Sequence, residues 1–351
     1  KHTTEKQENG YENFVRSLPK FAKLLGIDPI KLYESLNHLD NTEGKEKDTN
    51  MGLIYKQLRM LKNQLQSQLP IISKKRELFD CLKKSNLVVL EGETGSGKST
   101  QLPQMLCEYY KVFKNPDSKP IMLTQPRKIA TRTLAERIAF EMGEEVHGFV
   151  DYMASSGSKV NRNSKIIVKL DRLLLDEIEV DPLLKNYSCL VIDEAHERTI
   201  SIDVIIGLIT NILKERKDFK VIITSATLDA SLFEKYFAAK TFKVSGRLYP
   251  VEIIHKSYTE EETIENKIYK CLTEDILESR QALKSSYQGH VLSFCTGVEE
   301  INRLCERMKN FLNMSNFLVI ALHGKLTAEE QRLAFSESHG KYKIIFSTRI
   351  A

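Results

Sequence analysis

One short stretch constrains the fold more than any other part of the chain: Gly92-Glu93-Thr94-Gly95-Ser96-Gly97-Lys98-Ser99-Thr100. An apolar run precedes it and a helix-like stretch, Gln101 to Tyr110, follows it. Glycines allow the backbone to curl until its N–H groups point at phosphate oxygens, Lys98 adds a positive charge near the outer phosphates, and the Ser99 hydroxyl can bind Mg²⁺. The pattern predicts a phosphate-binding loop between a strand and a helix. An ordinary Gly/Ser turn would need neither the lysine nor this glycine spacing.

From Leu69 onwards, short apolar runs alternate with helical stretches, which is typical of a parallel α/β sheet covered on both faces. The predicted strands are Leu87 to Leu90, Ile121 to Thr124, Lys165 to Leu170, Cys189 to Ile192 and Lys220 to Thr224. Ligands bind at the carboxyl ends of the strands in such a sheet. Polar residues follow all but one of these runs, so we expect the site at that edge.

A second α/β series begins near Lys243. Its predicted strands are Val251 to His255, Val291 to Phe294, Leu318 to Leu322 and Tyr342 to Ser347, and its predicted helices are Ile264 to Arg280, Val298 to Phe311 and Thr327 to Ser336. The sequence stops at Ala351, directly after a strand. We therefore expect an incomplete second sheet and a parent protein that continues beyond Ala351.

The first 68 residues have a different character. Apolar residues at three- and four-residue steps predict a helix that ends at Gly26, and Asp28-Pro29 is typical of the start of a second helix. We favour a small helical hairpin over a separate partner-binding module. The run 41–50 has no apolar residue and is interpreted as a linker, followed by a helix from Leu53 to Leu65. The predicted organisation is a helical region at 1–40, a linker and helix at 41–68, a first domain at 69–243 and a second domain at 244–351.

Composition narrows the class of protein without naming a function. The 52 Lys and Arg residues are nearly balanced by 47 Asp and Glu residues, so the net charge of +5 permits a polyanionic partner without requiring one. No apolar run is long enough to cross a bilayer and no signal peptide leads the sequence, so we expect a nuclear or cytoplasmic protein that does not bind membranes. The cysteines have no C-x-x-C spacing and are expected to be buried free thiols in a reducing compartment: Cys81, Cys107, Cys189, Cys271, Cys295 and Cys305.

Two carboxylates follow the apolar run that ends at Ile192. Asp193 can hold Mg²⁺ through its water shell, and Glu194 can orient and deprotonate a water that attacks a terminal phosphate. Neighbouring carboxylates are common at helix starts, but here a phosphate-binding loop lies in the same predicted sheet. His196 is expected either to contact the other domain or to sense the terminal phosphate.

Further polar residues follow two other predicted strands. The hydroxyls of Ser225 and Thr227 either cap a turn or link the nucleotide site to domain movement, and we favour the link. Arg127 follows a strand at the expected start of a helix, where it can contact a phosphate of a bound nucleic acid strand. The alternative for Arg127 is a solvated surface arginine.

Together these motifs resemble those of the DEAH-box helicases in order, spacing and type, from about Leu69 to Ala351. The matching stretches are Gly-Glu-Thr-Gly-Ser-Gly-Lys-Ser-Thr-Gln at 92–101, Thr-Gln-Pro-Arg at 124–127, Asp-Glu-Ala-His-Glu-Arg-Thr at 193–199, Ser-Ala-Thr-Leu at 225–228, Gly-Arg-Leu-Tyr-Pro-Val at 246–251, Phe-Cys-Thr-Gly at 294–297 with Glu299-Glu300-Ile301, and Leu-His-Gly at 322–324 with Gln331.

The resemblance implies two RecA-like domains in tandem, the second incomplete, with ATP bound between them and RNA as the usual polymer. It implies that Lys98, Ser99 and Thr100 bind phosphates and magnesium, that the metal site involves Ser99, Asp193 and Glu194, and that Ser225 and Thr227 couple hydrolysis to motion. By position in the family pattern, Arg137 and Phe335 would stack on the adenine. Arg127 and Thr296 resemble residues that contact the nucleic acid backbone.

The sequence departs from the family pattern at three places. Leu170-Asp171-Arg172 stands where the family usually has Thr-Asp-Gly, which removes a hydroxyl expected at a backbone phosphate, although Arg172 can replace part of the attraction. The stretch 148–152 lacks a usual arginine. Arg349 replaces the usual asparagine of the fifth motif, and the sequence stops before the arginine-rich sixth motif. Since arginine fingers contribute roughly a thousandfold or more to hydrolysis, we expect this chain to bind nucleotide better than it turns it over.

The resulting expectation is an ATP-dependent RNA helicase of the DEAH-box type that uses ATP and Mg²⁺ to translocate on RNA, unwind it or remodel ribonucleoproteins. We expect a monomer that works with an activating protein partner. Two alternatives stay open: a catalytically weak helicase-like scaffold that binds RNA or protein, and a DNA helicase with the same core.

Overall fold

The computed structural model describes residues 56–57, 59–61, 63–64, 69–115, 117–226, 235, 237, 239–245, 251–257, 261–277, 289–312 and 316–350. Contacts divide the chain into two compact units, with the division between Pro250 and Val251. The predicted N-terminal hairpin, the linker at 41–50, Thr227 and the motif residues 246–250 lie outside the described residues. Within the helix predicted from Leu53 to Leu65, the described positions are helical.

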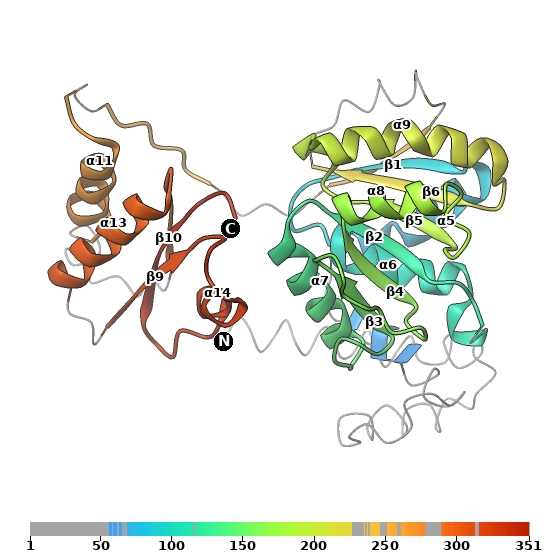
Figure 1. Ribbon diagram of the computed structural model, residues 1–351, viewed down its shortest axis with the longest axis horizontal. Helices are drawn as coiled ribbons and strands as arrows, with labels where there is room; N and C mark the ends of the chain where they lie inside the picture. Colours follow the sequence, from blue (N-terminus) through green and yellow to red (C-terminus); the bar gives the residue numbers. More distant parts are fainter. Residues whose placement is uncertain are drawn as a thin grey trace. The chain divides into compact units, whose positions relative to one another are not determined.

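The first unit is built on a seven-stranded sheet in the order β3-β4-β2-β5-β6-β1-β7, in which every pairing is parallel (Figure 1). Its central strands are continuous runs of buried aliphatic residues, as expected when both faces of a parallel sheet are covered. The strands are β1 Leu87–Gly92, β2 Ile121–Gln125, β3 Val150–Met153, β4 Ile166–Leu170, β5 Cys189–Ile192, β6 Lys220–Ser225 and β7 Lys240–Val244.

Helices cover this sheet on both sides, and the alternation of side chains along β1 divides the core accordingly. Val88 and Leu90 pack with α5, α6 and α7, whereas Leu87 and Val89 pack with α8 and α9, on the other face (Figure 1). The helical elements are α4 Pro70–Ser73, α5 Lys75–Lys84, α6 Lys98–Tyr109, η1 Val112–Lys114, α7 Lys128–Glu141, α8 Asp171–Val180, η2 Ala195–Glu197 and α9 Ile200–Glu215.

The strand register decides which polar residues meet. Thr124 of β2 lies opposite Ile192 of β5, and Glu91 of β1 lies opposite Ser225 of β6. Because the strands are parallel, their carboxyl ends gather at one edge of the sheet, with β6 between β1 and β5. The predicted phosphate loop, the Asp193-Glu194 pair and the residues that follow β2 and β6 therefore share that edge.

The second unit contains a three-stranded parallel sheet in the order β8-β10-β9. Ile301, Leu304 and Met308 of α13 form its core with Ile344 and Phe346 of β10. The elements are α11 Ile264–Lys270, the π-helical turn η3 Cys271–Leu277, β8 Val291–Phe294, α13 Val298–Phe311, β9 Phe317–Leu322, α14 Ala328–Phe335 and β10 Tyr342–Ser347. The predicted α/β class with parallel sheets is confirmed in both units.

One strand prediction is wrong, and two strands of the structure were not predicted. The strand predicted from Val251 to His255 is wrong, because residues 251–257 form no strand. Val251 is 81% exposed although it is an apolar residue. Strand β3 was missed because Asp151 interrupts its apolar pattern; this carboxylate is fully buried and accepts hydrogen bonds from the N–H groups of Tyr152 and Asn161. Strand β7 was missed because exposed Lys240 and Lys243 alternate with its apolar residues at the sheet edge.

The prediction of free thiols is confirmed for all six cysteines, but their burial was overestimated. Cys107, Cys189 and Cys305 are buried, whereas Cys81, Cys271 and Cys295 are partly exposed. Of the partly exposed thiols, Cys81 packs against the core of the first unit and Cys295 against the core of the second, each at the margin of its cluster. Among the helices of the described ranges, none combines the length and the apolar character needed to cross a bilayer.

Candidate functional site

The predicted phosphate loop connects β1 to α6 through two glycines in the left-handed region. Gly95 has φ +80° and Gly97 has φ +90°, a conformation that L side chains rarely adopt. A Cβ on Gly97 would lie 3.0 Å from Leu69 Cδ1, so the Leu69 side chain would have to shift to admit a larger residue. Gly97 is the N-cap of α6 and supplies no side-chain cap, which leaves the first helical N–H groups available to an anion.

The Lys98 side chain lies buried against its own loop. Its ammonium donates to the carbonyl oxygens of Gly92 and Glu93, the latter at 3.0 Å. Burial lowers the pKa of Lys98, and the negative charges of Glu194 and Asp193 oppose this shift. The loop lysine and the carboxylate pair, which are far apart in sequence, are therefore electrostatic neighbours in the fold.

Asp193 is fully buried, and its carboxylate is held from both sides. Gln125 donates its side-chain amide to Oδ2, and the Thr224 hydroxyl donates to Oδ1. A carboxylate has about four lone-pair sites, so two hydrogen bonds orient it and leave capacity for a metal-bound water. Sequence reasoning missed both donors; the signal available was that each lies at or next to the carboxyl end of a strand beside β5.

These residues fit a magnesium ion. The Asp193 carboxylate and the Ser99 hydroxyl are hard oxygen donors, which Mg²⁺ prefers. Over the described part of the chain, no group of three or more His, Cys, Asp or Glu side chains is placed to hold a metal. Mg²⁺ commonly keeps several waters and uses one or two protein ligands together with substrate phosphates, so a sparse donor set of this kind suits it.

Glu194 and His196 form a small network beside Asp193. Glu194 has φ +53°, and burial raises its pKa, as does the negative charge of Asp193. The Ala226 N–H lies 3.4 Å from His196 Nδ1, and His196 Nε2 lies 3.4 Å from Glu194 Oε2. The imidazole therefore links the carboxylate to the end of β6, a link that sequence reasoning missed.

Ser225 is the last residue of β6 and is fully buried. It lies opposite Glu91, immediately before the loop glycine Gly92. This places the Ser225 position beside the phosphate loop. The coupling role that we assigned to Ser225 and Thr227 stays a prediction.

Arg127 is not a free surface arginine. Its guanidinium forms an ion pair with Glu197 at 3.1 Å, and its side chain is 40% exposed. Arg127 is also the N-cap residue of α7, where the helix begins after β2. The pair joins the 124–127 motif to the 193–199 motif, and a phosphate approaching the guanidinium would compete with Glu197.

Residues 170–172, which depart from the family pattern, lie at the start of α8. Leu170 is the N-cap of α8 and provides no side-chain cap, while Arg172 is exposed. Asp171 is buried and accepts a hydrogen bond from the Thr199 hydroxyl at 2.7 Å. Thr199 in turn caps α9 by accepting from the Ile202 N–H at 3.1 Å. The aspartate that matches the family pattern thus joins the starts of two helices.

Arg137 lies on α7 with its side chain 61% exposed, and its Nε donates to Glu141 Oε1 at 2.8 Å. In the second unit, Thr296 follows β8 and its N–H and hydroxyl both donate to Glu300 Oε2, at 2.6 and 2.8 Å. Phe335 is the last residue of α14 and is 57% exposed. The base-stacking and RNA-binding roles of these residues stay predictions.

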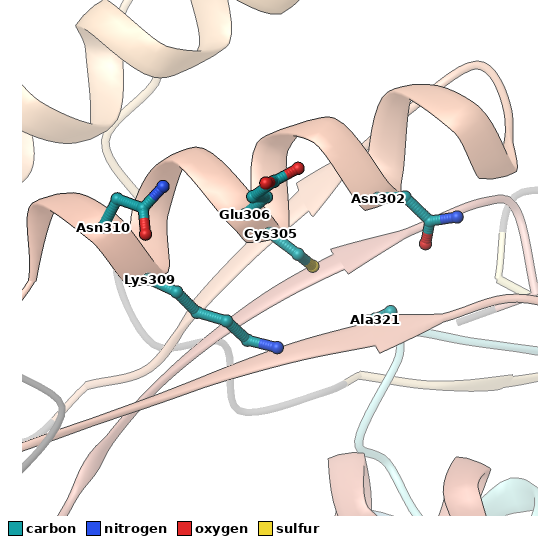
Figure 2. A pocket seen from close by; sticks show the side chains of 6 residues that line it. All are labelled: Asn302, Cys305, Glu306, Lys309, Asn310 and Ala321. Atoms are coloured by element: carbon teal, nitrogen blue, oxygen red, sulfur yellow. The ribbon is translucent and has the colours of Figure 1, made fainter.

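A hollow of about 320 Å³ lies beside α13 in the second unit (Figure 2). Cys305 and Lys309 point from the helix toward β9, where Ala321 lies (Figure 2). Burial raises the pKa of Cys305 to about 11, so this thiol is neutral and a poor nucleophile. The lining is Asn302, Cys305, Glu306, Lys309, Asn310 and Ala321, and it includes none of the predicted site residues.

Comparison with known families agrees with the motifs and their arrangement. A family model described as DEAD/DEAH box helicase matches residues 72–234, and one described as helicase conserved C-terminal domain matches residues 268–351. The chain belongs to the DEAD/DEAH-box helicases. The resemblance predicted from the sequence motifs is therefore confirmed.

Individual relatives of this chain are named as ATP-dependent RNA helicases. It is 32% identical over 342 residues to the ATP-dependent RNA helicase HrpA of Escherichia coli, covering 96% of this chain and 26% of the relative. It is 35% identical over 290 residues to the pre-mRNA-splicing factor ATP-dependent RNA helicase prp22 of Schizosaccharomyces pombe, covering 81% and 24%. The chain thus spans about a quarter of the length of these relatives.

A solved structure supports the fold assignment. The crystal structure of the Escherichia coli DEAH/RHA helicase HrpB matches with a TM-score of 0.68 at 28% sequence identity, covering 81% of this chain and 35% of that chain. The two parallel-sheet units of this helicase chain therefore have a counterpart in a solved member of the family.

Proposed function

We propose that this chain is the nucleotide-binding part of an ATP-dependent RNA helicase of the DEAH type, which couples ATP hydrolysis to RNA translocation, unwinding or ribonucleoprotein remodelling. One observation carries the proposal: buried Lys98 in a glycine-rich loop is an electrostatic neighbour of Asp193 and Glu194 at the edge of one parallel sheet. The family names of the relatives support ATP and RNA as ligands.

Each residue of this edge has a proposed task. The N–H groups of residues 92–100 and the Lys98 ammonium bind the phosphates, while Ser99 and Asp193, with Glu194 nearby, hold Mg²⁺. When bound, Mg²⁺ supplies positive charge that offsets charge on the phosphate oxygens. Glu194 accepts a proton from the attacking water, and its raised pKa makes it a better base than an ordinary glutamate. His196, whose Nε2 lies 3.4 Å from Glu194 Oε2, orients the Glu194 carboxylate.

The remaining predicted residues are proposed to read the base, couple motion and bind RNA. Arg137 and Phe335 stack on adenine, Ser225 and Thr227 couple hydrolysis to domain movement, and Arg127, Arg172 and Thr296 contact the RNA backbone. Arg127 and Thr296 now pair with Glu197 and Glu300, respectively, so RNA would exchange a carboxylate partner for a phosphate. We further propose an intracellular monomer that works with an activating protein.

The decisive experiment measures ATP hydrolysis with and without single-stranded RNA, on this chain and on the longest natural protein that contains it. The control is Glu194→Gln, which keeps the size of the side chain and removes the base. We expect RNA-stimulated turnover that the substitution abolishes, and little stimulation by DNA of the same sequence because DNA lacks 2′-hydroxyls. ATP binding without turnover by either protein would instead favour the scaffold.

The altered 170–172 stretch gives a second test. Restoring the family residues with Leu170→Thr and Arg172→Gly should tighten single-stranded RNA binding, since the threonine hydroxyl can donate to a backbone phosphate. Leu170→Thr alone should also stabilise α8 by about 1 kcal/mol, because position 170 is an N-cap without a side-chain cap. Fluorescence anisotropy with labelled RNA measures the first effect and urea unfolding the second. Unchanged RNA affinity in the double variant would show that these positions do not limit binding.

A further inference from the structure

Glu141, at the C-terminal end of α7, is a buried carboxylate with an unusual set of partners. Its Oε2 accepts hydrogen bonds from the side-chain amides of Gln101 at 2.6 Å and Gln104 at 2.7 Å. Its Oε1 accepts from Arg137 Nε at 2.8 Å. The Glu141 side chain is only 9% exposed, whereas that of Arg137 is 61% exposed. The Glu141 carboxylate therefore links the buried glutamine amides to the exposed guanidinium of Arg137.

The two amides come from the helix that begins with the phosphate loop. Gln101 and Gln104 lie on α6, which starts at Lys98, and both side chains are buried. Gln104 also donates to the Thr100 carbonyl at 2.9 Å. In the described part of the chain, the Oε1 atoms of both glutamines have no hydrogen-bond partner, so both amides are oriented to donate and leave buried acceptors unsatisfied. Such an arrangement costs stability, and its result is a carboxylate fixed to the phosphate-loop helix.

An exposed arginine on a helix samples many rotamers, and ordering it costs free energy each time a ligand requires one of them. The bond to Glu141 restricts Arg137, and the Phe140 ring centroid lies 5.9 Å from its Cζ. Because Glu141 is itself held by α6, the Arg137 guanidinium is fixed relative to the phosphate loop. Fixing the guanidinium also fixes the distance between a phosphate on that loop and a flat group stacked on Arg137.

We propose that Glu141 is a positioning residue for the nucleotide base: it holds the Arg137 guanidinium in place through Gln101 and Gln104 of the phosphate-loop helix. This rests on the proposed function, in which Arg137 stacks on the base. Glu141 has no contact with the nucleotide in this scheme and acts through Arg137. Its loss therefore weakens the part of the affinity that depends on the base and leaves the part that depends on the phosphates.

The test compares two probes, MgADP and Mg-pyrophosphate, binding to wild type and variants by calorimetry. The main variant is Glu141→Gln, which keeps volume and can be accommodated if one glutamine amide flips to present its free Oε1. The matched control is Glu136→Gln, which removes the same kind of pair, Arg132 with Glu136 at 2.9 Å, five residues earlier on α7. We expect Glu141→Gln to weaken MgADP roughly two- to fivefold, the size of an exposed cation–π contact, and to leave Mg-pyrophosphate and the control unchanged.

A double-mutant cycle with Arg137→Ala separates the routes by which Glu141 acts. If Glu141 works through Arg137, the double variant binds MgADP no more weakly than Arg137→Ala alone. Additive losses would overturn the proposal, and so would equal weakening of both probes, or an Arg137→Ala variant that binds MgADP like wild type. If Glu141→Gln does not fold, Glu141→Asp keeps the charge and the same comparison applies. A wild-type chain that binds neither probe would instead refute the proposed function.

Discussion

At the scale of single residues, side chains from neighbouring strands and His196 surround Asp193 and Glu194, the two carboxylates that we propose carry the chemistry. Asp193 and Glu194 are predicted site residues because they follow an apolar strand in a chain with a phosphate loop. The donors to Asp193 come from other strands, and the His196 bridge depends on Ala226, a backbone group that no residue pattern marks. Tertiary packing decides such partners, so sequence periodicity cannot reveal them.

The environment of Glu194 predicts an unusual acid limb in the pH dependence of hydrolysis. Burial raises its pKa, Asp193 and Glu197 add to the shift, and His196 and Lys98 oppose it. Only the ionised form can accept a proton, so activity should fall as pH decreases through the raised pKa, at higher pH than for an ordinary glutamate. The measurement is kcat against pH with saturating RNA and ATP.

His196→Ala distinguishes the two groups that can cause this limb. Removing a partner that favours ionised Glu194 should move the limb to still higher pH. Disappearance of the limb in His196→Ala would assign it to the imidazole and contradict the role of Glu194.

At the scale of elements, continuous apolar runs predicted the central strands well because these strands are buried on both faces. Edge and interrupted strands were missed, since Lys240 and Lys243 in β7 and buried Asp151 in β3 break the pattern. The 251–257 segment shows the opposite error, in which apolar residues are exposed. Capping residues determine where helices begin and end. Thr199 is an example: its hydroxyl accepts a hydrogen bond from the Ile202 N–H at the start of α9 and donates one to Asp171 of α8.

Replacing Thr199 by valine should destabilise the first unit. The change removes an N-cap, which costs about 1 kcal/mol, and leaves a buried Asp171 oxygen without its hydroxyl donor, which costs a similar amount or more. We therefore expect a loss of about 2 kcal/mol in the free energy of unfolding, measured by urea denaturation. Thr199→Ser keeps the hydroxyl and serves as the control. Equal stability of the two variants would show that the hydroxyl contributes nothing.

At the scale of the whole molecule, two units with separate cores follow one another along the chain. We propose that they are the two helicase domains expected from the sequence. The segment 251–257 begins the second unit, has no regular secondary structure and exposes Val251, Ile253 and Ile254. The β-branched apolar residues there are typical of a strand, so sequence alone placed the start of the second sheet too early.

Limited proteolysis tests this organisation. Elastase cleaves after small aliphatic residues, and 251–254 exposes three of them in a segment without regular secondary structure. We therefore expect the first cut there. The expected products are two stable fragments that divide the chain near Val251, the larger of which retains nucleotide affinity. Mass spectrometry identifies the cut. A first cleavage inside the seven-stranded sheet would contradict the division.

The order of strands in the first sheet has a consequence for synthesis on the ribosome. Strand β1, which ends at the phosphate loop, is the first of the seven to be made, yet its neighbours β6 and β7 are the last. On one side of β1, Leu87 pairs with Val221 of β6, and on the other side Val88 pairs with Lys240 of β7. Neither side of β1 can be paired before these later residues have been synthesised. Until then the nascent chain carries a strand of four apolar residues with no partner on either edge. Because the strands around the phosphate loop pair late, nucleotide cannot assist the early steps of folding. The need for chaperones that shield unpaired strands is greatest before β6 leaves the ribosome.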